Sequence, residues 1–448
     1  MPSSQLSPIS REILSRTLMS LVTLACLSAS TQYVYAGPLI PRPAASQVGL
    51  ERAWFAQIGT DPARSEVTAW TLHDDCLFGV TDSGTAFALD ANTGARLWVR
   101  QVGKQGYRAF GPGANSRFVA IVSGAKLYLL NRDDGRLMWS RDLGSAPGAG
   151  PAITEDYAFV VMLTGRVEGY DLNDPDARPW YYNSRGRAYL RPVTTGEVVS
   201  WPTSAGLLYV SSATKLGLLY RLETNDEIVA PPAEMDGNLY IASLDGYLYS
   251  IDGLTGNENW RFATGYPVET APAVVGKRVY VSSSEPAIHA VDTKSGRELW
   301  DIAGSNIFVA QGKSRVYAAD SRGSLQILDT ETGSILGTLN TAEGIYPLVN
   351  EQTDRIYLVN RHGLVQCLHE IGADKPLRHR SMAKAKLKKE DDSDVNPFGE
   401  ETPVEAGEGN AFDEALEAGP AEETPAEERA DEADQGENNL FDDLDFFE

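Results

Sequence analysis

The side chains that most often carry out chemistry are few in this chain, and they are not grouped. Three cysteines in 448 residues leave no CxxC pair for zinc, thiol redox chemistry or haem attachment. Most carboxylates stand in turn-like contexts, where they usually accept backbone hydrogen bonds. No metal-ligand spacing connects the five histidines, which are His73, His289, His362, His369 and His379. The sequence therefore predicts no catalytic residue, no metal and no cofactor.

Arginine and tyrosine, in contrast, occur together in short segments, which are Gly106–Gly113, Ser184–Pro192, Tyr266–Pro272 and Glu343–Leu348. Aromatic and Arg side chains dominate the energetics of protein interfaces. A guanidinium group also suits carboxylates and acidic peptides. We predict a partner-binding surface made of Tyr107, Arg108, Arg187, Tyr189, Arg191, Glu269 and Tyr346.

These segments recur because the chain is built from a repeat. An aromatic residue inside a short β-rich run marks each unit, at Phe78, Phe118, Phe159, Tyr209, Tyr240, Tyr280, Tyr317 and Tyr357. The intervals are 40, 41, 50, 31, 40, 37 and 40 residues, so the two unusual values together make two periods. Each unit reads as four short strands separated by Asp/Ser/Thr-Gly turns. Four strands per roughly 40 residues are typical of a β-propeller blade.

The sequence predicts an all-β protein, an eight-bladed propeller of four-stranded blades that spans residues 49–372. The last unit, Arg355–His369, has no Trp-bearing outer strand after it. Such a strand occurs instead at the start of the chain, around Trp54. We expect this N-terminal strand to complete the last blade and close the ring.

The fourth unit departs from the pattern. From Trp180 to Tyr209 there are 29 residues instead of the usual 20. We interpret this as an insertion, Trp180–Pro192, followed by a blade with a shortened outer strand and no Trp. The insertion is either part of the partner-binding surface or a loop that replaces lost packing.

Four segments resemble the tryptophan-docking motif of the pyrroloquinoline-quinone-type propeller family. They are Ala88–Trp98, Leu129–Trp139, Ser250–Trp260 and Ala290–Trp300, and a weaker copy has Leu336 in the Trp position. The resemblance implies that the Trp packs against the neighbouring blade. It assigns a structural docking role to Trp54, Trp98, Trp139, Trp180, Trp260 and Trp300.

The resemblance leaves two functional classes open. Quinone-dependent dehydrogenases usually carry a vicinal disulfide, whereas Cys76 and Cys367 are 291 residues apart. The chain also resembles the BamB family of outer-membrane assembly propellers, which bind protein partners and do not catalyse a reaction. It differs from them in its weak lipobox and its long acidic tail. We expect a non-catalytic scaffold, with the dehydrogenase-like enzyme or a small-ligand-binding propeller as the alternative.

The N-terminal residues predict export. Arg11 and Arg16 precede an apolar stretch, Leu18–Ala29, which is short for a membrane span and suits a signal peptide. We predict a signal peptide over residues 1–36, a linker over 37–48 and a periplasmic or other extracytoplasmic location. A lipid anchor at Cys26 and an uncleaved segment are the alternatives.

The C-terminal residues predict a disordered arm over 373–448. The net charge of the chain is −23, and Glu390–Glu448, with 23 acidic residues against Arg429, carries −22 of it. A near-neutral body with an acidic tail excludes a basic nucleic-acid-binding protein, and we expect a monomeric propeller. Three Asn-x-Phe phrases followed by acidic residues, at Phe398, Phe412 and Phe441, are either linear docking motifs or a product of the biased composition.

Overall fold

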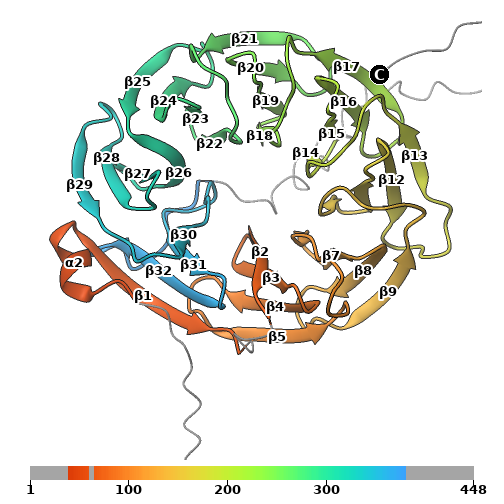
Figure 1. Cartoon of the computed structure of the whole chain (residues 1–448), viewed down its shortest axis with the longest axis horizontal. Helices are drawn as coiled ribbons and strands as arrows, with labels where there is room; N and C mark the ends of the chain where they lie inside the picture. The colour runs from red at the N-terminus through yellow and green to blue at the C-terminus, as the bar shows by residue number, and fades with distance from the viewer. Residues whose placement is uncertain (1–38, 60–64, 380–448) are drawn as a thin grey trace, which may run out of the picture. The chain divides into compact units, whose positions relative to one another are not determined.

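The computed structural model describes residues 39–59 and 65–379 of the chain. These residues form eight four-stranded antiparallel sheets that are arranged as blades around a central axis (Figure 1). The prediction of an eight-bladed all-β propeller is confirmed. The predicted signal peptide with Cys26 and the phrases around Phe398, Phe412 and Phe441 lie outside the described residues.

The blades follow one another in chain order, each from its innermost to its outermost strand. Blade 1 contains β2 (Val67–His73), β3 (Cys76–Thr81), β4 (Thr85–Asp90) and β5 (Arg96–Gln101). Blade 2 contains β6 (Gly113–Ala114), β7 (Phe118–Ser123), β8 (Lys126–Asn131) and β9 (Leu137–Asp142). Blade 3 contains β10 (Ala152–Ile153), β11 (Tyr157–Val161), β12 (Arg166–Asp171) and β13 (Trp180–Asn183). Blade 4 contains β14 (Val193–Thr194), β15 (Val198–Pro202), β16 (Leu207–Ser212) and β17 (Leu218–Glu223).

The second half of the ring repeats this arrangement. Blade 5 contains β18 (Ala233–Met235), β19 (Asn238–Ala242), β20 (Tyr247–Asp252) and β21 (Glu258–Ala263). Blade 6 contains β22 (Ala273–Val275), β23 (Arg278–Ser283), β24 (Ala287–Asp292) and β25 (Glu298–Ala303). Blade 7 contains β26 (Ser305–Gln311), β27 (Arg315–Asp320), β28 (Leu325–Asp329) and β29 (Ile335–Leu339). Blade 8 contains β30 (Ile345–Pro347), β31 (Ile356–Asn360), β32 (Leu364–Glu370) and, as its outermost strand, β1 (Leu50–Gln57).

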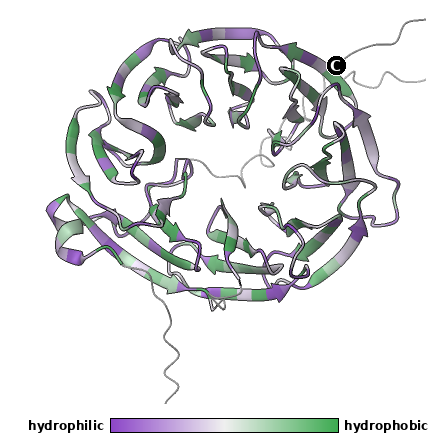
Figure 2. Ribbon diagram, viewed as in Figure 1, coloured by the Kyte–Doolittle hydropathy of each residue, from purple (hydrophilic) through white to green (hydrophobic). Residues whose placement is uncertain are grey.

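The burial of side chains follows the position of each strand in its blade. The second and third strands lie between neighbouring blades and are buried almost throughout, as in β3 and β4. The outer strands carry both hydrophilic and hydrophobic residues (Figure 2), and in β5 only Trp98 is buried. The core therefore consists of a series of apolar clusters between adjacent blades rather than one central core.

The N-terminal strand closes the ring, as predicted. Strand β1 pairs antiparallel with β32 from Leu50, opposite Glu370, to Gln57, opposite Leu364. Trp54 lies opposite Cys367, and its ring centroid is 6.1 Å from that of Tyr357. Blade 8 thus joins the two ends of the chain in one sheet.

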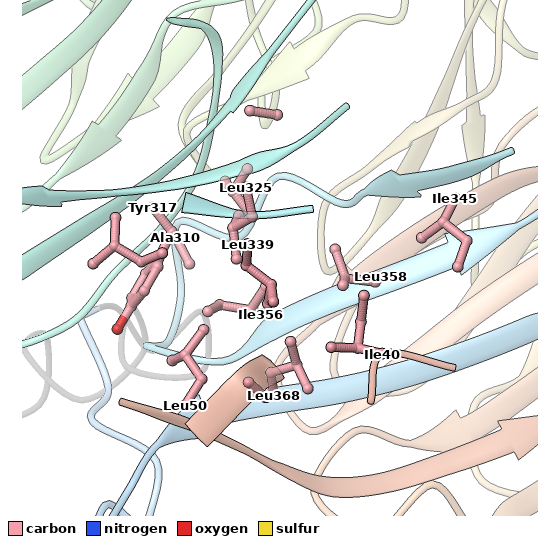
Figure 3. Packing of buried hydrophobic residues seen from close by; sticks show 14 residues of the cluster. Ile40, Leu50, Ala310, Tyr317, Leu325, Leu339, Ile345, Ile356, Leu358 and Leu368 are labelled. Carbon is pink, nitrogen blue, oxygen red and sulfur yellow. The ribbon is translucent and has the colours of Figure 1, made fainter. Parts of the chain in front are cut away.

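The junction between blades 7 and 8 is filled by the chain that precedes β1. Residues 42–47, which the sequence assigned to a linker, form helix α2 (Arg42–Gln47). Ile40 and Leu50 belong to the same buried cluster as Ile356 and Leu368 of blade 8 (Figure 3). The register puts Gly337, not Leu336, in the docking position of blade 7, and Val48 lies against it. The helix and its flanks therefore occupy the space that a docking Trp fills elsewhere.

The predicted insertion before blade 4 is wrong. The marker aromatic of a blade lies on the second strand, opposite a residue of the innermost strand, as Phe159 lies opposite Ala152 in blade 3 and Tyr240 opposite Ala233 in blade 5. In blade 4 the residue in this position is Ser200, which lies opposite Val193. Tyr209 belongs to the next strand, β16. Ser200 is 41 residues after Phe159 and 40 before Tyr240, so the period is unbroken. A small residue at the marker position led us to count from the wrong strand.

The outer strand of blade 4 is also complete. Strand β17 has six residues, like β5 and β21. Its docking residue is Tyr220, whose hydroxyl donates to the carbonyl oxygen of Gly253 at 2.9 Å. The marker in blade 2 was also assigned to the wrong residue. Ala120, not Phe118, lies opposite the innermost strand, at Gly113, in the position that the marker aromatic has in other blades.

The docking tryptophans connect their blades to the next, and in blades 1, 5 and 6 they do so through the same two contacts. The ring of Trp98 lies on Gly135, and its Nε1 donates to the carbonyl oxygen of Arg132 at 2.7 Å. Trp260 and Trp300 make the same contacts with the following blades, at Gly296 and Gly333. Trp139 donates to the carbonyl oxygen of Leu172 at 3.3 Å, and Trp54 lies on Gly94. Trp180 is half-buried in the cluster between blades 3 and 4, and its ring centroid is 6.5 Å from that of Phe159.

This contact makes a glycine-specific prediction. Gly135 has φ +68°, and an added Cβ would lie 2.6 Å from the Trp98 ring. Gly276 has φ +60°, and an added Cβ would have no atom within 4 Å. Alanine at either site costs about 1–2 kcal/mol for the left-handed backbone, and only Gly135→Ala must also displace the indole. We expect Gly135→Ala to lower the free energy of unfolding by about 1–3 kcal/mol more than Gly276→Ala. If urea titrations show that both variants lose the same free energy of unfolding, the Trp98–Gly135 contact is contradicted.

Candidate functional site

The antiparallel blades divide the loops between two faces of the ring. One end of every blade carries the connection to the next blade and the turn between its second and third strands. We call this side the inter-blade face. The opposite end carries the turns between the first and second strands and between the third and fourth strands. We call it the hairpin face.

The predicted Arg/Tyr loops lie on the inter-blade face and are held by the following blade. The amide of Gly124, in a turn of blade 2, donates to the carbonyl oxygen of Arg108 at 2.8 Å. In blade 4, the Ser204 amide donates to the Arg187 carbonyl oxygen at 2.9 Å, and the Arg187 amide donates to Ser204 Oγ at 3.0 Å. These backbone bonds fix the loops before a partner arrives, which reduces the entropy lost on binding.

Several of the predicted side chains are exposed on this face. Tyr107 is 58% exposed, and its ring lies against Gly124. Arg108, Arg187 and Glu269 are also exposed. Tyr189 is half-buried and donates to Glu227 Oε1 at 2.5 Å, which connects two successive inter-blade loops. Burial and this carboxylate raise the pKa of Tyr189 to about 12, so its hydroxyl keeps the proton at neutral pH.

Two of the predicted residues are placed differently. The guanidinium of Arg191 reaches Gly113 on β6, an innermost strand, rather than the face. Its burial there lowers its pKa to about 10, which leaves it charged at neutral pH. Tyr346 belongs to β30, the innermost strand of blade 8, rather than to a loop, and is 36% exposed. The structure thus brings Tyr107, Arg108, Arg187, Tyr189 and Glu269 to one face. Arg191 turns toward β6, and Tyr346 lies near the start of an innermost strand.

The sequence missed two exposed apolar side chains on the inter-blade face. Tyr266 follows β21 and is 51% exposed, and Leu163 lies in the turn between β11 and β12 and is 43% exposed. Tyr266 was inside a selected segment. Leu163 could have been found from the Thr164-Gly165 turn, because every second-to-third-strand turn lies on this face.

A central cavity of about 770 Å³ opens on the hairpin face. First-to-second-strand turns of blades 1–5 line it, and His379 closes one side. Arg132 Nη1 donates to Nδ1 of His73 and to the carbonyl oxygen of Asn115, both at 2.7 Å. Burial, and then the Arg132 charge, lower the pKa of His73 to about 4. His73 is therefore neutral at pH 7, and its ring accepts from Arg132 through Nδ1.

The lining of this cavity could not be predicted from the sequence, because it comes from turns that are far apart in the chain. Within residues 39–59 and 65–379, no three His, Cys, Asp or Glu side chains are arranged to hold a metal ion. No helix in this part of the chain has the length and hydrophobicity needed to cross a bilayer. Cys76 and Cys367 are both free thiols.

Solved structures with the same architecture come from several kinds of protein. BamB from Moraxella catarrhalis is 20% identical with a TM-score of 0.57, and the alignment covers 71% of this chain and 97% of that one. The computationally designed protein Ika8 is 16% identical with a TM-score of 0.56, and the alignment covers 68% of this chain and 96% of Ika8. The C-terminal WD40 domain of Sif2 is 11% identical with a TM-score of 0.54, and the alignment covers 71% of this chain and 98% of that domain. These likenesses establish the fold.

Sequence comparison gives shorter matches. The serine/threonine-protein kinase AfsK of Streptomyces griseus is 25% identical over 187 residues, which are 41% of this chain and 19% of the kinase. The outer membrane protein assembly factor BamB of Xanthomonas campestris pv. campestris is 32% identical over 130 residues. That match covers 27% of this chain and 31% of the relative. The chain thus spans less than a third of either relative.

A family model covers much more of the propeller. The model for the outer membrane protein assembly factor BamB matches residues 82–215 and 218–371, from the end of β3 to the end of β32. These two ranges are well over half of the 448 residues. The chain therefore belongs to the BamB family of outer membrane protein assembly factors.

Proposed function

We propose that this protein is an exported, non-catalytic scaffold that binds protein partners in the cell envelope and takes part in outer-membrane protein assembly. The observation that carries the proposal is the family match, which extends through nearly the whole ring. The predicted signal peptide supports an extracytoplasmic location.

The inter-blade face is the proposed partner surface. It presents exposed Tyr107 and Arg187 on loops that backbone hydrogen bonds hold in place. Tyr and Arg are enriched among the residues that contribute most to interface affinity. Arg191 is not part of this surface, because its guanidinium lies against Gly113 of β6.

The matched test compares two double variants. Tyr107→Ala with Arg187→Ala changes the inter-blade face, and Leu254→Ala with Arg136→Ala removes exposed side chains from third-to-fourth-strand turns of the hairpin face. We expect the first pair to weaken capture of envelope partners from the native organism more than tenfold. The second pair should leave capture unchanged, and both should melt like the wild type. Equal capture by the two variants would place the partner surface elsewhere.

The enzyme alternative has a separate test. The docking motif is shared with quinone-dependent dehydrogenases, so the full-length protein is incubated with pyrroloquinoline quinone, calcium and a panel of alcohols and sugars. We expect no quinone-dependent dye reduction. A signal that requires both quinone and substrate would overturn the non-catalytic proposal.

A further inference from the structure

The C-terminal chain leaves the ring toward the centre of the hairpin face and not from its rim. After β32, Arg355 Nη2 donates to the carbonyl oxygens of Ala373 and Asp374, at 2.8 and 2.9 Å. The Leu377 amide then donates to Asp354 Oδ1 at 3.1 Å. The packed part of the chain thus extends beyond residue 372, where the sequence placed the end of the propeller.

The next contacts lead this segment to the innermost strands. The His379 amide donates to the Gln352 carbonyl oxygen at 2.8 Å. Nε2 of His379 lies 2.6 Å from the carbonyl oxygen of Gln311, at the end of β26. Arg378 forms an ion pair with Asp75 of blade 1. His379 is the last described residue, and it already lines the central cavity.

The cavity that receives the chain is lined with negative charge. Its wall holds five carboxylates against one arginine, Arg117, and these carboxylates are Asp74, Glu155, Asp156, Glu234 and Asp236. Arg117 lies 3.9 Å from both Glu155 and Asp156, so it offsets only part of that charge. His73, with its pKa lowered to about 4, adds no positive charge at pH 7. The charges of Arg132 and Arg191, which also act on His73, reduce the excess of carboxylates but do not remove it.

The sequence that follows His379 has the opposite charge. Residues 380–389 include five basic side chains and no acidic one, namely Arg380, Lys384, Lys386, Lys388 and Lys389. Ten residues reach at most about 33–36 Å when extended, and this segment starts inside the cavity. Its effective concentration there is that of a tethered ligand, which for short tethers is in the millimolar range.

We propose that Arg380–Lys389 binds in the carboxylate-lined cavity as an intramolecular basic peptide. The cavity is a site for a lysine-rich peptide, and the chain supplies its own occupant. The proposal does not rest on the proposed function, because the cavity is formed by hairpin-face turns and not by the inter-blade loops.

Photo-crosslinking in the full-length protein tests this directly. Ala383 is replaced by p-benzoylphenylalanine, the protein is irradiated at low concentration, and adducts are mapped by mass spectrometry. We expect adducts on the cavity turns, at residues 114–117, 153–156, 194–196 and 234–237. Their yield should fall at least threefold in 1 M salt, where the screening length is about 3 Å. Adducts confined to residues 390–448, to other surfaces or to a second copy would overturn the proposal.

A matched pair of variants separates charge attraction from chance proximity. Glu155→Gln with Asp236→Asn removes two cavity charges, and asparagine tolerates the left-handed backbone of residue 236, φ +50°. Glu223→Gln with Asp301→Asn removes two exposed charges from outer strands β17 and β25. We expect the first pair to lower the cavity adduct yield at least threefold and the second to leave it unchanged. Equal yields in both pairs would contradict recognition by the carboxylates.

Discussion

Deletion of Gly37–Gly59 is expected to destabilise the whole propeller, with a melting temperature at least about 10 °C below that of the full chain. The deletion removes β1, the outermost strand of blade 8, together with buried Ile40, Leu50, Trp54 and Ile58. Each large buried side chain contributes about 2–5 kcal/mol, and 1 kcal/mol shifts the melting temperature of a large domain by about 2–4 °C. Because β1 connects the last blade to the first, its loss opens the ring rather than fraying one end.

The control for this deletion is removal of Glu390–Glu448. This segment is predicted from its composition to be unable to fold alone, so its removal should leave the melting temperature unchanged. Limited proteolysis of the intact protein should cut within the segment before it cuts the propeller. Identical melting temperatures for the full chain and the Gly37–Gly59 deletion would contradict ring closure by β1.

Trp98→Ala is expected to lower the free energy of unfolding by about 3–5 kcal/mol. Trp98 is 5% exposed, its ring lies on Gly135, and its N–H is bonded to the next blade. The neighbouring Leu97 is 44% exposed on the same strand, so Leu97→Ala should change stability by no more than about 0.5 kcal/mol. Urea unfolding of both variants measures the difference. Similar losses in the two would show that the indole does not connect blades 1 and 2.

The sequence predicted the propeller because the docking contact is local and repeated. A Trp, a turn glycine and an aromatic strand residue recur at nearly constant intervals, and most blades carry at least two of the three. The strands of blade 4 were predicted incorrectly because Ser200 replaces the marker aromatic and Tyr220 replaces the docking Trp. Tyr209, one strand later, offered a false marker. Helix α2 and residues 373–379 could not be predicted, because the partners that hold them come from distant parts of the chain.

The candidate surface was predictable only in part. Loop position followed from the repeat, so the exposed Tyr107 and Arg187 were found. The repeat does not show where a loop ends and an inner strand begins, or which way the side chains point there. Tyr346 was therefore assigned to a loop and Arg191 to the exposed face. The carboxylates of the central cavity are spread over several blades and form no contiguous motif, so only the closed ring brings them together.

The most direct test of the proposed function is photo-crosslinking from defined positions in cells of the native organism. The crosslinking amino acid replaces Tyr107 or Tyr266 on the inter-blade face, or Leu254 on the hairpin face, each of which is more than half exposed. The proposed function predicts adducts with outer-membrane protein assembly components from positions 107 and 266 and none from 254. Adducts from position 254 alone, or the absence of protein adducts from all three positions, would contradict it.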